Sequence, residues 1–367
     1  QAKADDSAPF PGTKPLTWDG DLTSRHVEGA DRFLLMQLEQ SVDNRSQFWK
    51  RDTASPEAYR KSVEPNRKEL ARILGVVDQR ISFDAPQLIA TTKQSAVIGE
   101  SDSFTALAVR WPVLGGIQSE GVLLEPRTKK PLANVIALPD ADQTPEQLCG
   151  LSEGIAPESQ FARHLAESGC RVLVPTLISR TMERRRGRAN LTHREYLYRT
   201  SFEMGRHIIG YEIQKTLAGV DWFKKENPQL PVGVFGYGEG GLLALYAGAL
   251  DERIDVTAVS GYFNSRQNVW QEPISRNVFG LLKQFGDAEL MSLIDPRSII
   301  IEAAKGPELT LPSEGGAPAR LVTPNPESVR AEFQRGLQMV KDLKWNNKPK
   351  LVLSPTNEVA IGGGFGP

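Results

Sequence analysis

The stretch VGVFGYGEGGLLALYAGAL, residues 232–250, places a short apolar run, a group of glycines and a second apolar run in succession. The first run predicts a buried strand and the second a buried helix, with a tight turn between them at Gly238. Gly236 and Gly240 lie two positions before and after that turn. A strand that passes straight into a helix through glycines indicates an α/β fold, with this turn at one edge of the sheet.

Strands and helices alternate on both sides of this unit. Further buried strands are expected at 133–139, 170–178, 255–263, 296–304 and 348–355, and helices at 157–169, 193–226 and 326–343. Continuous apolar runs are typical of strands buried on both faces, and their alternation with helices predicts a mostly parallel, doubly wound sheet. Shorter runs between residues 81 and 126, separated by turn residues, predict antiparallel strands at the N-terminal edge of this sheet.

Three segments are predicted along the chain. Residues 1–27, rich in Pro, Asp, Ser and Lys, are expected to be an extended leader. Residues 28–78 are expected to form an N-terminal helical extension of two helices, the second capped by Ser55. Residues 79–367 are expected to form the α/β domain, without the helix that usually follows the last strand. Because the chain starts without methionine on a small, polar, proline-bearing segment, we expect a removed leader peptide and export to the periplasm or the medium.

The composition suits a globular protein with a large core. Of the 367 residues 40% are apolar and 24% charged, and the net charge of -1 gives no reason to expect a nucleic-acid partner. No run of about 18 apolar residues is present, so no membrane span is expected. Cys149 and Cys170 are too few for a disulfide framework, and the sequence leaves open whether they are two thiols or one bridge. The four histidines show no metal-ligand spacing, so neither a metal nor a cofactor is predicted.

The order of elements resembles the α/β-hydrolase superfamily, and within it the acetyl-xylan-esterase and dienelactone-hydrolase-like branch. Three stretches carry the resemblance: GYGEGG at 236–241, GDAELMSLIDPRSIIIEAAKGPE at 286–308, and LVLSP with GGGFGP between 351 and 367. In that branch they correspond to the nucleophile elbow, the segment that leads to the catalytic acid, and the last strand with the histidine loop. The resemblance spans about residues 100 to 367 and implies an α/β-hydrolase fold with carboxylic-ester hydrolase ancestry.

The residues expected at the three catalytic positions of that family are absent. A serine hydrolase needs a hydroxyl nucleophile on the turn, then a carboxylate and then a histidine. Gly238 stands at the nucleophile position, no aspartate follows the strand that ends near Glu302, and all four histidines precede the turn. The resemblance therefore implies a catalytically degenerate, carbohydrate-esterase-like domain, similar to the triad-less first half of tandem hydrolase proteins. Such a domain would act with an active hydrolase domain or subunit, or bind a carbohydrate.

Glu239 provides the main alternative. Some hydrolases of this fold use a carboxylate at the turn, so the second hypothesis is an active ester hydrolase with a site around Glu239, or one completed by residues beyond Pro367. Centring the turn on Glu239 would put Tyr237 where a small residue is needed, whereas centring it on Gly238 puts glycine at both flanking positions. Glu239 is therefore expected to follow the nucleophile position, where its backbone N–H would form half of the oxyanion hole. A carbohydrate-binding module is the third hypothesis.

Several polar side chains are candidate ligand contacts at the same edge of the sheet. Glu239, Asp140, Asp142 and Glu302 could bind a cation or sugar hydroxyls there. The alternative is that Asp140 and Asp142 only shape their loop, as aspartate usually does.

Two further candidates lie in loops. Arg184 and Arg185, within RTMERRRGR at 180–188, could bind an anionic ligand such as a uronate, or lie in a solvated loop. Trp270 could form a platform for a sugar ring, or pack within its loop.

Overall fold

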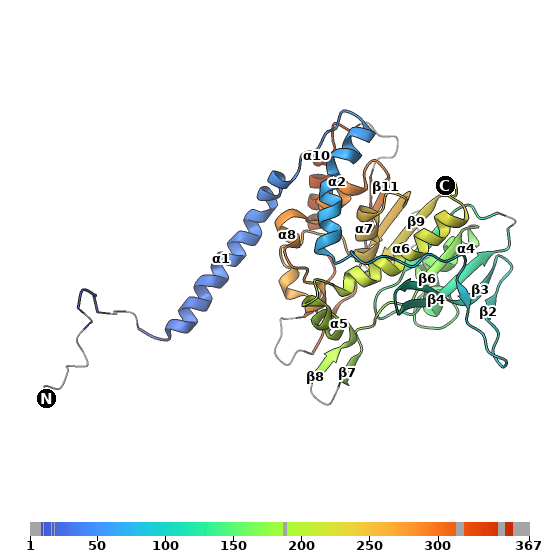
Figure 1. Cartoon of the computed structure of the whole chain (residues 1–367), viewed down its shortest axis with the longest axis horizontal. Coiled ribbons are helices and arrows are strands. Elements are labelled where there is room, and N and C mark those ends of the chain that lie inside the picture. The colour runs from blue at the N-terminus through green and yellow to red at the C-terminus, as the bar shows by residue number, and fades with distance from the viewer. Residues whose placement is uncertain are drawn as a thin grey trace.

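The structure is a computed structural model that describes residues 9, 11–15, 17, 19–128, 130–185, 189–312, 319–343 and 349–354. A ten-stranded sheet runs through the body, and one long helix projects from it (Figure 1). The strands are β1 (Gln87–Leu88), β2 (Val97–Glu100), β3 (Phe104–Leu114), β4 (Ile117–Pro126), β5 (Asn134–Leu138), β6 (Arg171–Pro175), β9 (Val232–Tyr237), β10 (Val256–Ser260), β11 (Ser298–Ala303) and β14 (Lys350–Leu353). Their order in the sheet is β1-β3-β4-β6-β5-β9-β10-β11-β14, with β2 paired to β3.

The strand directions confirm the predicted sheet. Strands β6, β5, β9, β10, β11 and β14 pair in parallel, whereas β1, β2, β3 and β4 pair antiparallel at the N-terminal edge. The register pairs Leu138 with Gly236, and Ser260 with both Tyr237 and Glu302. The carboxyl ends of β5, β9, β10 and β11 therefore meet at one edge, which is where open α/β sheets bind their ligands.

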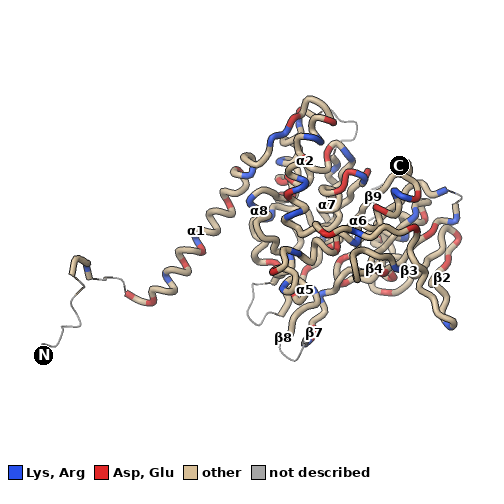
Figure 2. Tube along the Cα trace, in the orientation of Figure 1, with Lys and Arg blue, Asp and Glu red and all other residues tan. Residues whose placement is uncertain are grey.

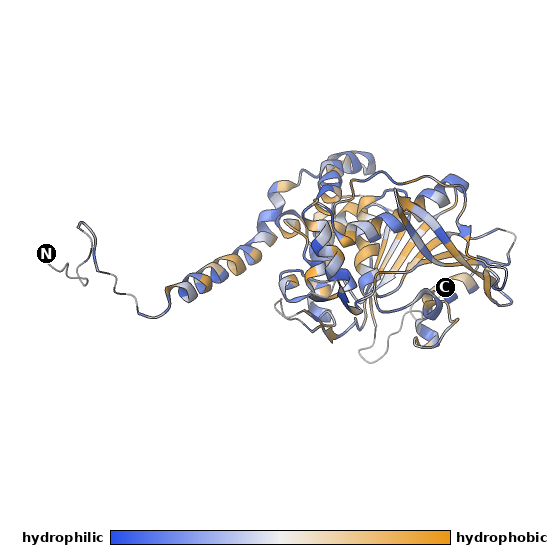
Figure 3. Ribbon diagram, turned by 60° about the horizontal axis from the view of Figure 1, so that its bottom comes forward, coloured by the Kyte–Doolittle hydropathy of each residue, from blue (hydrophilic) through white to orange (hydrophobic). Residues whose placement is uncertain are grey.

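Helices cover both faces of the sheet. The helices α6 (Ile208–Glu226), α7 (Glu239–Leu250) and α9 (Asp287–Ile294) contribute to one apolar cluster, and α3 (Pro145–Leu148) and α4 (Phe161–Glu167) to another. In β4, Leu123 belongs to the first cluster and Val122 and Leu124 to the second, because successive strand residues point to opposite faces. The strands are accordingly among the most apolar parts of the body in Figure 3.

Two helices precede the sheet. In α2 (Pro56–Ile73), Ser55 accepts a hydrogen bond from the Ala58 backbone N–H, which confirms the predicted cap. The buried Tyr59 hydroxyl of this helix donates to the Ser292 carbonyl oxygen at 2.8 Å, so α2 is attached to α9. The other helix, α1 (Leu22–Asn44), is the one that projects, and a 3-10 turn, η1 (Arg45–Phe48), joins it to the body.

Three local expectations differ from the structure. Helix α1 begins at Leu22, so the last residues of the expected extended leader are helical, and Asp21 caps them. The single helix expected over 193–226 is two helices, α5 (His193–Phe202) and α6, because Gly205 adopts a φ of 61° and His207 caps the second. The segment expected to be a basic loop contains the strand β7 (Met182–Arg185), which pairs antiparallel with β8 (Ala189–Thr192).

The remaining elements are short or peripheral. They are the 3-10 turns η2 (Pro157–Ser159), η3 (Val269–Gln271) and η4 (Ile274–Arg276), the helices α8 (Leu281–Gln284) and α10 (Pro326–Met339), and the paired strands β12 (Leu309–Thr310) and β13 (Arg320–Leu321). Acidic and basic residues are interspersed along the described part of the trace (Figure 2), in keeping with the small net charge.

Candidate functional site

The turn between β9 and α7 has the strained backbone of a nucleophile elbow. Gly238 adopts φ 58° and ψ −116°, a conformation that L side chains rarely adopt. A Cβ atom at Gly236 would overlap the Gly240 carbonyl oxygen, and one at Gly240 would overlap the Leu138 carbonyl oxygen. Glycine is thus required at both flanking positions, and the frame centred on Gly238 is the one that the backbone adopts.

A carboxylate of the chain accepts a hydrogen bond from the backbone N–H that follows this turn. The backbone N–H of Glu239 donates a hydrogen bond to Asp140 Oδ1 at 2.9 Å. Asp140 is buried and lies two residues after the end of β5. Because Glu239 is the first residue of α7, its N–H has no acceptor within the helix, and Asp140 supplies one.

The space above Gly238 is also filled. A Cβ atom at this position would lie 2.6 Å from Asp140 Oδ1 and 3.0 Å from Pro307 Cγ. Pro307 belongs to the segment that follows β11, and the Tyr237 hydroxyl donates to the Lys305 carbonyl oxygen at 3.1 Å in the same segment. Side-chain atoms of the chain therefore stand where a nucleophile would project.

Arg180 holds Asp140 and Asp142 together. Its Nη1 lies 2.6 Å from Asp140 Oδ2 and 2.9 Å from Asp142 Oδ2, and its backbone N–H donates to Asp142 Oδ1 at 2.9 Å. Burial alone would raise the pKa of Asp140, but the Arg180 guanidinium and the Glu239 N–H outweigh burial and lower that pKa below its usual value. Asp140 is therefore an ionised hydrogen-bond acceptor at the elbow.

The Glu239 side chain points into a cluster of arginines. Its Oε1 lies 2.7 Å from Arg194 Nη2, and its Oε2 lies 2.8 Å from Arg276 Nε and 3.1 Å from Arg180 Nη2. Only 1% of the Glu239 surface is exposed. Burial would raise its pKa, but the three guanidinium groups hold the pKa far below the usual range of a carboxyl group. The carboxylate is thus ionised and fully engaged within the protein.

Two further carboxylates, those of Glu212 and Glu272, form ion pairs with these arginines. Arg194 also pairs with Glu212 at 2.9 Å, and Arg276 pairs with Glu272 at 2.9 Å. Arg266 donates to both oxygens of the same Glu272 at 2.8 Å. The resulting ion-pair network, which consists of Asp140, Asp142, Glu212, Glu239, Glu272, Arg180, Arg194, Arg266 and Arg276, fills the interior directly behind the elbow.

The structure brings some of the predicted site residues together and separates others. Asp140, Asp142 and Glu239, which were expected as ligand contacts at one edge of the sheet, all pair with Arg180. Glu302 lies near the end of β11, two strands away from β9 in the sheet, and its Oε1 accepts a hydrogen bond from Ser354 Oγ at 2.6 Å. The segment GGGFGP at 362–367, which corresponds to the histidine loop of that family but contains no histidine, lies outside the described residues.

The remaining candidates lie elsewhere. Arg184 is an exposed residue of β7, and the Arg185 side chain lies outside the described residues. Trp270 is partly exposed beside α1 and α8, away from the elbow. Both cysteines are free thiols: Cys149 is buried and Cys170 is half-buried.

The arginines that pair with Glu239 were not among the predicted site residues. Arg180 stands at the start of the basic segment, but Arg194 and Arg276 occur in a helix and a turn with no motif around them. The one available signal is the place of Glu239 at the start of a helix predicted to be buried, because a buried charge requires a partner.

A polar cavity opens beside the network. Its volume is about 280 Å³, and it extends along the end of β10 to the segment around Pro307. The lining includes the polar side chains of Asn264, Ser265, Arg266, Asn268, Gln271 and Arg320. In the described part of the chain, no three His, Cys, Asp or Glu side chains are grouped to hold a metal ion. The described helices include none long and apolar enough to cross a membrane.

Comparison with known proteins places the fold. No protein-family model and no curated protein matches the chain. Among solved structures, it is similar to a protein from Bacteroides fragilis NCTC 9343 provisionally assigned as an acetyl xylan esterase, with a TM-score of 0.59, 16% identity, and 91% of this chain and 83% of that chain covered. At this identity, the likeness concerns the fold, which is that of an acetyl-xylan-esterase-like α/β-hydrolase.

Two other esterases are more distant. Acetyl xylan esterase 1 from Thermoanaerobacterium sp. JW/SL YS485 has a TM-score of 0.46 and 13% identity, over 86% of this chain and 91% of that chain. A carbohydrate esterase family 15 glucuronoyl esterase from Caldicellulosiruptor kristjansonii has a TM-score of 0.45 and 14% identity, over 82% of this chain and 81% of that chain.

Proposed function

We propose that this chain is a catalytically silent, carbohydrate-esterase-like α/β-hydrolase domain that acts by binding rather than by hydrolysis. The observation that carries the proposal is the hydrogen bond from the Glu239 backbone N–H to Asp140 Oδ1. In an active esterase this N–H stabilises the oxyanion of the tetrahedral intermediate. Loss of one such donor typically reduces kcat by about 10²- to 10³-fold. In this chain the donor is already hydrogen-bonded to the Asp140 carboxylate.

The absence of a nucleophile supports the same proposal. Gly238 has no side chain, and Asp140 and Pro307 fill the space into which one would project. The elbow therefore has no attacking group, and its oxyanion donor is already hydrogen-bonded to Asp140, although the backbone geometry of the turn is kept.

Glu239 does not replace the missing hydroxyl. A carboxylate nucleophile must reach the substrate, whereas both oxygens of Glu239 are paired with arginines and the residue is buried. Moving it toward a ligand would break three charge-assisted hydrogen bonds, each worth about 1.5 to 3 kcal/mol.

We assign the binding role to the polar cavity beside the elbow. Its volume of about 280 Å³ lies just below the range of about 300 to 1,000 Å³ that is usual for ligand pockets, so it suits a small ligand. The amides of Asn264, Asn268 and Gln271 and the hydroxyl of Ser265 are donors and acceptors for sugar hydroxyls. In this proposal the chain is exported and supplies carbohydrate binding to an active hydrolase domain or subunit.

Ester hydrolysis by the full chain tests the first part of the proposal. We expect p-nitrophenyl acetate and acetylated xylose to be hydrolysed at the same rate with native protein, heat-denatured protein and Glu239→Gln. Turnover by the native protein that is absent from a Glu239→Gln variant with the circular dichroism spectrum of the folded protein would instead establish an active site around Glu239.

Calorimetric titration with xylose and xylo-oligosaccharides tests the second part. Gln271→Ala, in the cavity lining, is expected to weaken binding, whereas Gln229→Ala, an exposed glutamine outside the cavity, should leave it unchanged. Equal affinities of the two variants would place the ligand elsewhere, and a lack of binding by the native protein would contradict the carbohydrate role.

A further inference from the structure

Arginines outnumber carboxylates in the lining of the polar cavity beside the elbow. Among the described residues, the charged side chains of this lining are those of Arg266, Arg276, Arg320 and Glu272. Because recesses lined mainly by one sign of charge concentrate ligands of the opposite sign, the composition of the wall favours an anionic ligand. Which of these charges a ligand can use depends on their partners within the chain.

Two of the three arginines are paired with carboxylates of the chain. Arg266 Nη2 donates to both oxygens of Glu272 at 2.8 Å, and Arg276 Nη1 donates to Glu272 Oε2 at 2.9 Å. The other two guanidinium nitrogen atoms of Arg276 pair with Glu239 at 2.8 Å. All three nitrogen atoms of Arg276 are therefore engaged, and Glu272 is the partner of two arginines.

Arg320 supplies a charge that these pairs do not neutralise. It belongs to β13, where its backbone pairs with Thr310 of β12, and its side chain is exposed. Within the described ranges, no carboxylate forms an ion pair with Arg320, in contrast to Arg266 and Arg276. Because an arginine stays protonated at all ordinary pH values, Arg320 brings a full positive charge to the cavity.

Arg266 adds hydrogen-bond donors in a fixed position. Its hydrogen bonds to described residues use Nη2 alone, so its Nε and Nη1 have no acceptor among these residues. The centre of its guanidinium lies 4.7 Å from the centre of the Tyr262 ring, a typical cation–π distance. Glu272 and Tyr262 thus hold the planar group at the wall, and a guanidinium presents its N–H groups in the geometry that a carboxylate accepts.

Neutral donors lie in the same wall. Asn264 Oδ1 accepts hydrogen bonds from the Ser265 backbone N–H and the Ser328 hydroxyl, which leaves the amide nitrogen of Asn264 for a ligand. Gln271 contributes a second side-chain amide. The Asn264 backbone N–H donates to Asp287, and burial raises the pKa of Asp287 to about 7. Below that pH the Asp287 carboxyl is mainly protonated and adds little negative charge behind the wall.

On the basis of the carbohydrate role proposed above, we infer that the ligand of this cavity is an acidic sugar whose carboxylate binds Arg320 and Arg266. A uronate carries one carboxylate and several hydroxyls on a single ring, which matches a wall with the charge of Arg320 beside neutral amides. A neutral sugar would leave Arg320 without a counter-charge. An inorganic anion would offer no ring hydroxyls to the amides.

Calorimetric titration of the full chain at pH 6 with glucuronate and glucose tests the inference. The two sugars differ only at C6, so the ratio of their affinities isolates the effect of the carboxylate. We expect glucuronate to bind the native protein at least about tenfold more tightly, because charge-assisted hydrogen bonds are about twice as strong as neutral ones. In Arg320→Gln this ratio should fall at least about fivefold, and circular dichroism verifies that the variant is folded.

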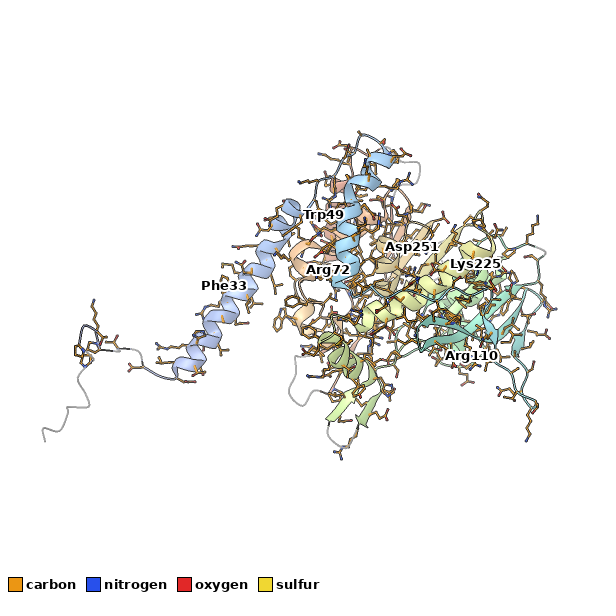
Figure 4. All side chains as sticks on the ribbon, in the orientation of Figure 1. Phe33, Trp49, Arg72, Arg110, Lys225 and Asp251 are labelled. Atoms are coloured by element: carbon orange, nitrogen blue, oxygen red, sulfur yellow. The ribbon has the colours of Figure 1, made fainter. Side chains whose placement is uncertain are left out.

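Arg110→Gln is the matched control. Arg110 is an exposed arginine of β3 outside the cavity lining, and Figure 4 shows it at the antiparallel edge of the sheet. Its replacement should keep the affinity ratio of the native protein. Sulfate, the probe for a bare anion, should bind more weakly than glucuronate.

The outcomes distinguish the acidic ligand from the carbohydrate role itself. Equal affinities for glucuronate and glucose, or a preference that Arg320→Gln retains, would overturn the acidic sugar and leave the carbohydrate role intact. Sulfate that binds as tightly as glucuronate would show a site for anions in general and would also overturn it. Binding of neither sugar would contradict both proposals.

Discussion

Replacement of Arg194 by methionine is expected to destabilise the protein strongly. Arg194 is 1% exposed, and its guanidinium contacts Glu239 at 2.7 Å and Glu212 at 2.9 Å. Methionine keeps much of the length of the side chain but removes the charge. Glu239 retains Arg180 and Arg276, whereas Glu212 loses the one ion pair that the described part of the chain gives it.

The magnitude follows from the buried charge that remains. Removal of one member of a buried ion pair typically costs about 3 to 5 kcal/mol, because the other charge stays desolvated. Unfolding entropies near 2.1 cal/mol/K per residue give about 0.8 kcal/mol/K for 367 residues. The melting temperature of Arg194→Met is therefore expected to fall by about 4 to 7 °C.

Urea denaturation and scanning calorimetry measure this effect in five proteins: the native protein, Arg194→Met, Glu212→Met, the double variant of these two, and Arg199→Met. The double variant Arg194→Met with Glu212→Met should regain part of the loss, because an apolar pair often replaces a buried ion pair without cost. Arg199→Met is the control on the same helix: its pair with Glu195 is solvent-exposed, and its loss should cost under about 1 kcal/mol. An Arg194→Met variant as stable as the control, or a double variant that shows the sum of two single losses, would refute the reasoning.

Three further predictions concern the elbow, a buried acid and the thiols. Gly238→Ser should lower the free energy of unfolding by about 1 to 3 kcal/mol without producing esterase activity, since φ is 58° and the new Cβ would lie 2.6 Å from Asp140. Burial raises the pKa of Asp287 to about 7, so the folded protein keeps a proton that the unfolded chain releases near pH 4. The free energy of unfolding should therefore fall by up to about 1.4 kcal/mol per pH unit as the pH rises from 4 to 7. Asp287→Asn should remove this slope, since it resembles the protonated acid. Burial also raises the pKa of the Cys149 thiol, so native protein should react with a thiol reagent at Cys170 alone.

Each of these predictions has a simple control. Gly115→Ser, at a glycine with open space around its Cβ position, should leave stability within about 0.5 kcal/mol. The stability difference between native protein and Asp287→Asn should be constant above pH 7 and change between pH 4 and 7; a difference independent of pH would contradict the raised pKa. Two rapidly reacting thiols in native protein would contradict the burial of Cys149.

The sheet and the elbow could be predicted because their signals are local. Continuous apolar runs mark strands buried on both faces. At the elbow, Gly236 lies against the carbonyl oxygen of Gly240, four residues on, and Gly238 adopts a φ of 58°, so two of the glycine requirements are local, whereas Gly240 lies against Leu138 of β5. The expected positions of Asp140 and Glu239 at one edge followed from parallel strand order alone. These features depend on periodicity and chain direction, both of which a sequence displays directly.

The network behind the elbow could not be predicted in the same way. Arg194 and Arg276 are 82 positions apart in sequence and meet on Glu239 only because η4 packs against α5. The break before α6 was missed because the helical pattern on both sides is strong, whereas Gly205 and the His207 cap act over a few residues. Contacts between distant segments depend on packing, for which one sequence carries little signal.

Hydrogen exchange at the Glu239 backbone amide tests the central claim most directly. This amide has no acceptor in α7, so its protection depends on Asp140. The account predicts slow exchange in the native protein and exchange faster by at least an order of magnitude in Asp140→Ala, with other amides of α7 unchanged. Fast exchange in the native protein, unaffected by Asp140→Ala, would show that the N–H is free to stabilise an oxyanion and would contradict the account.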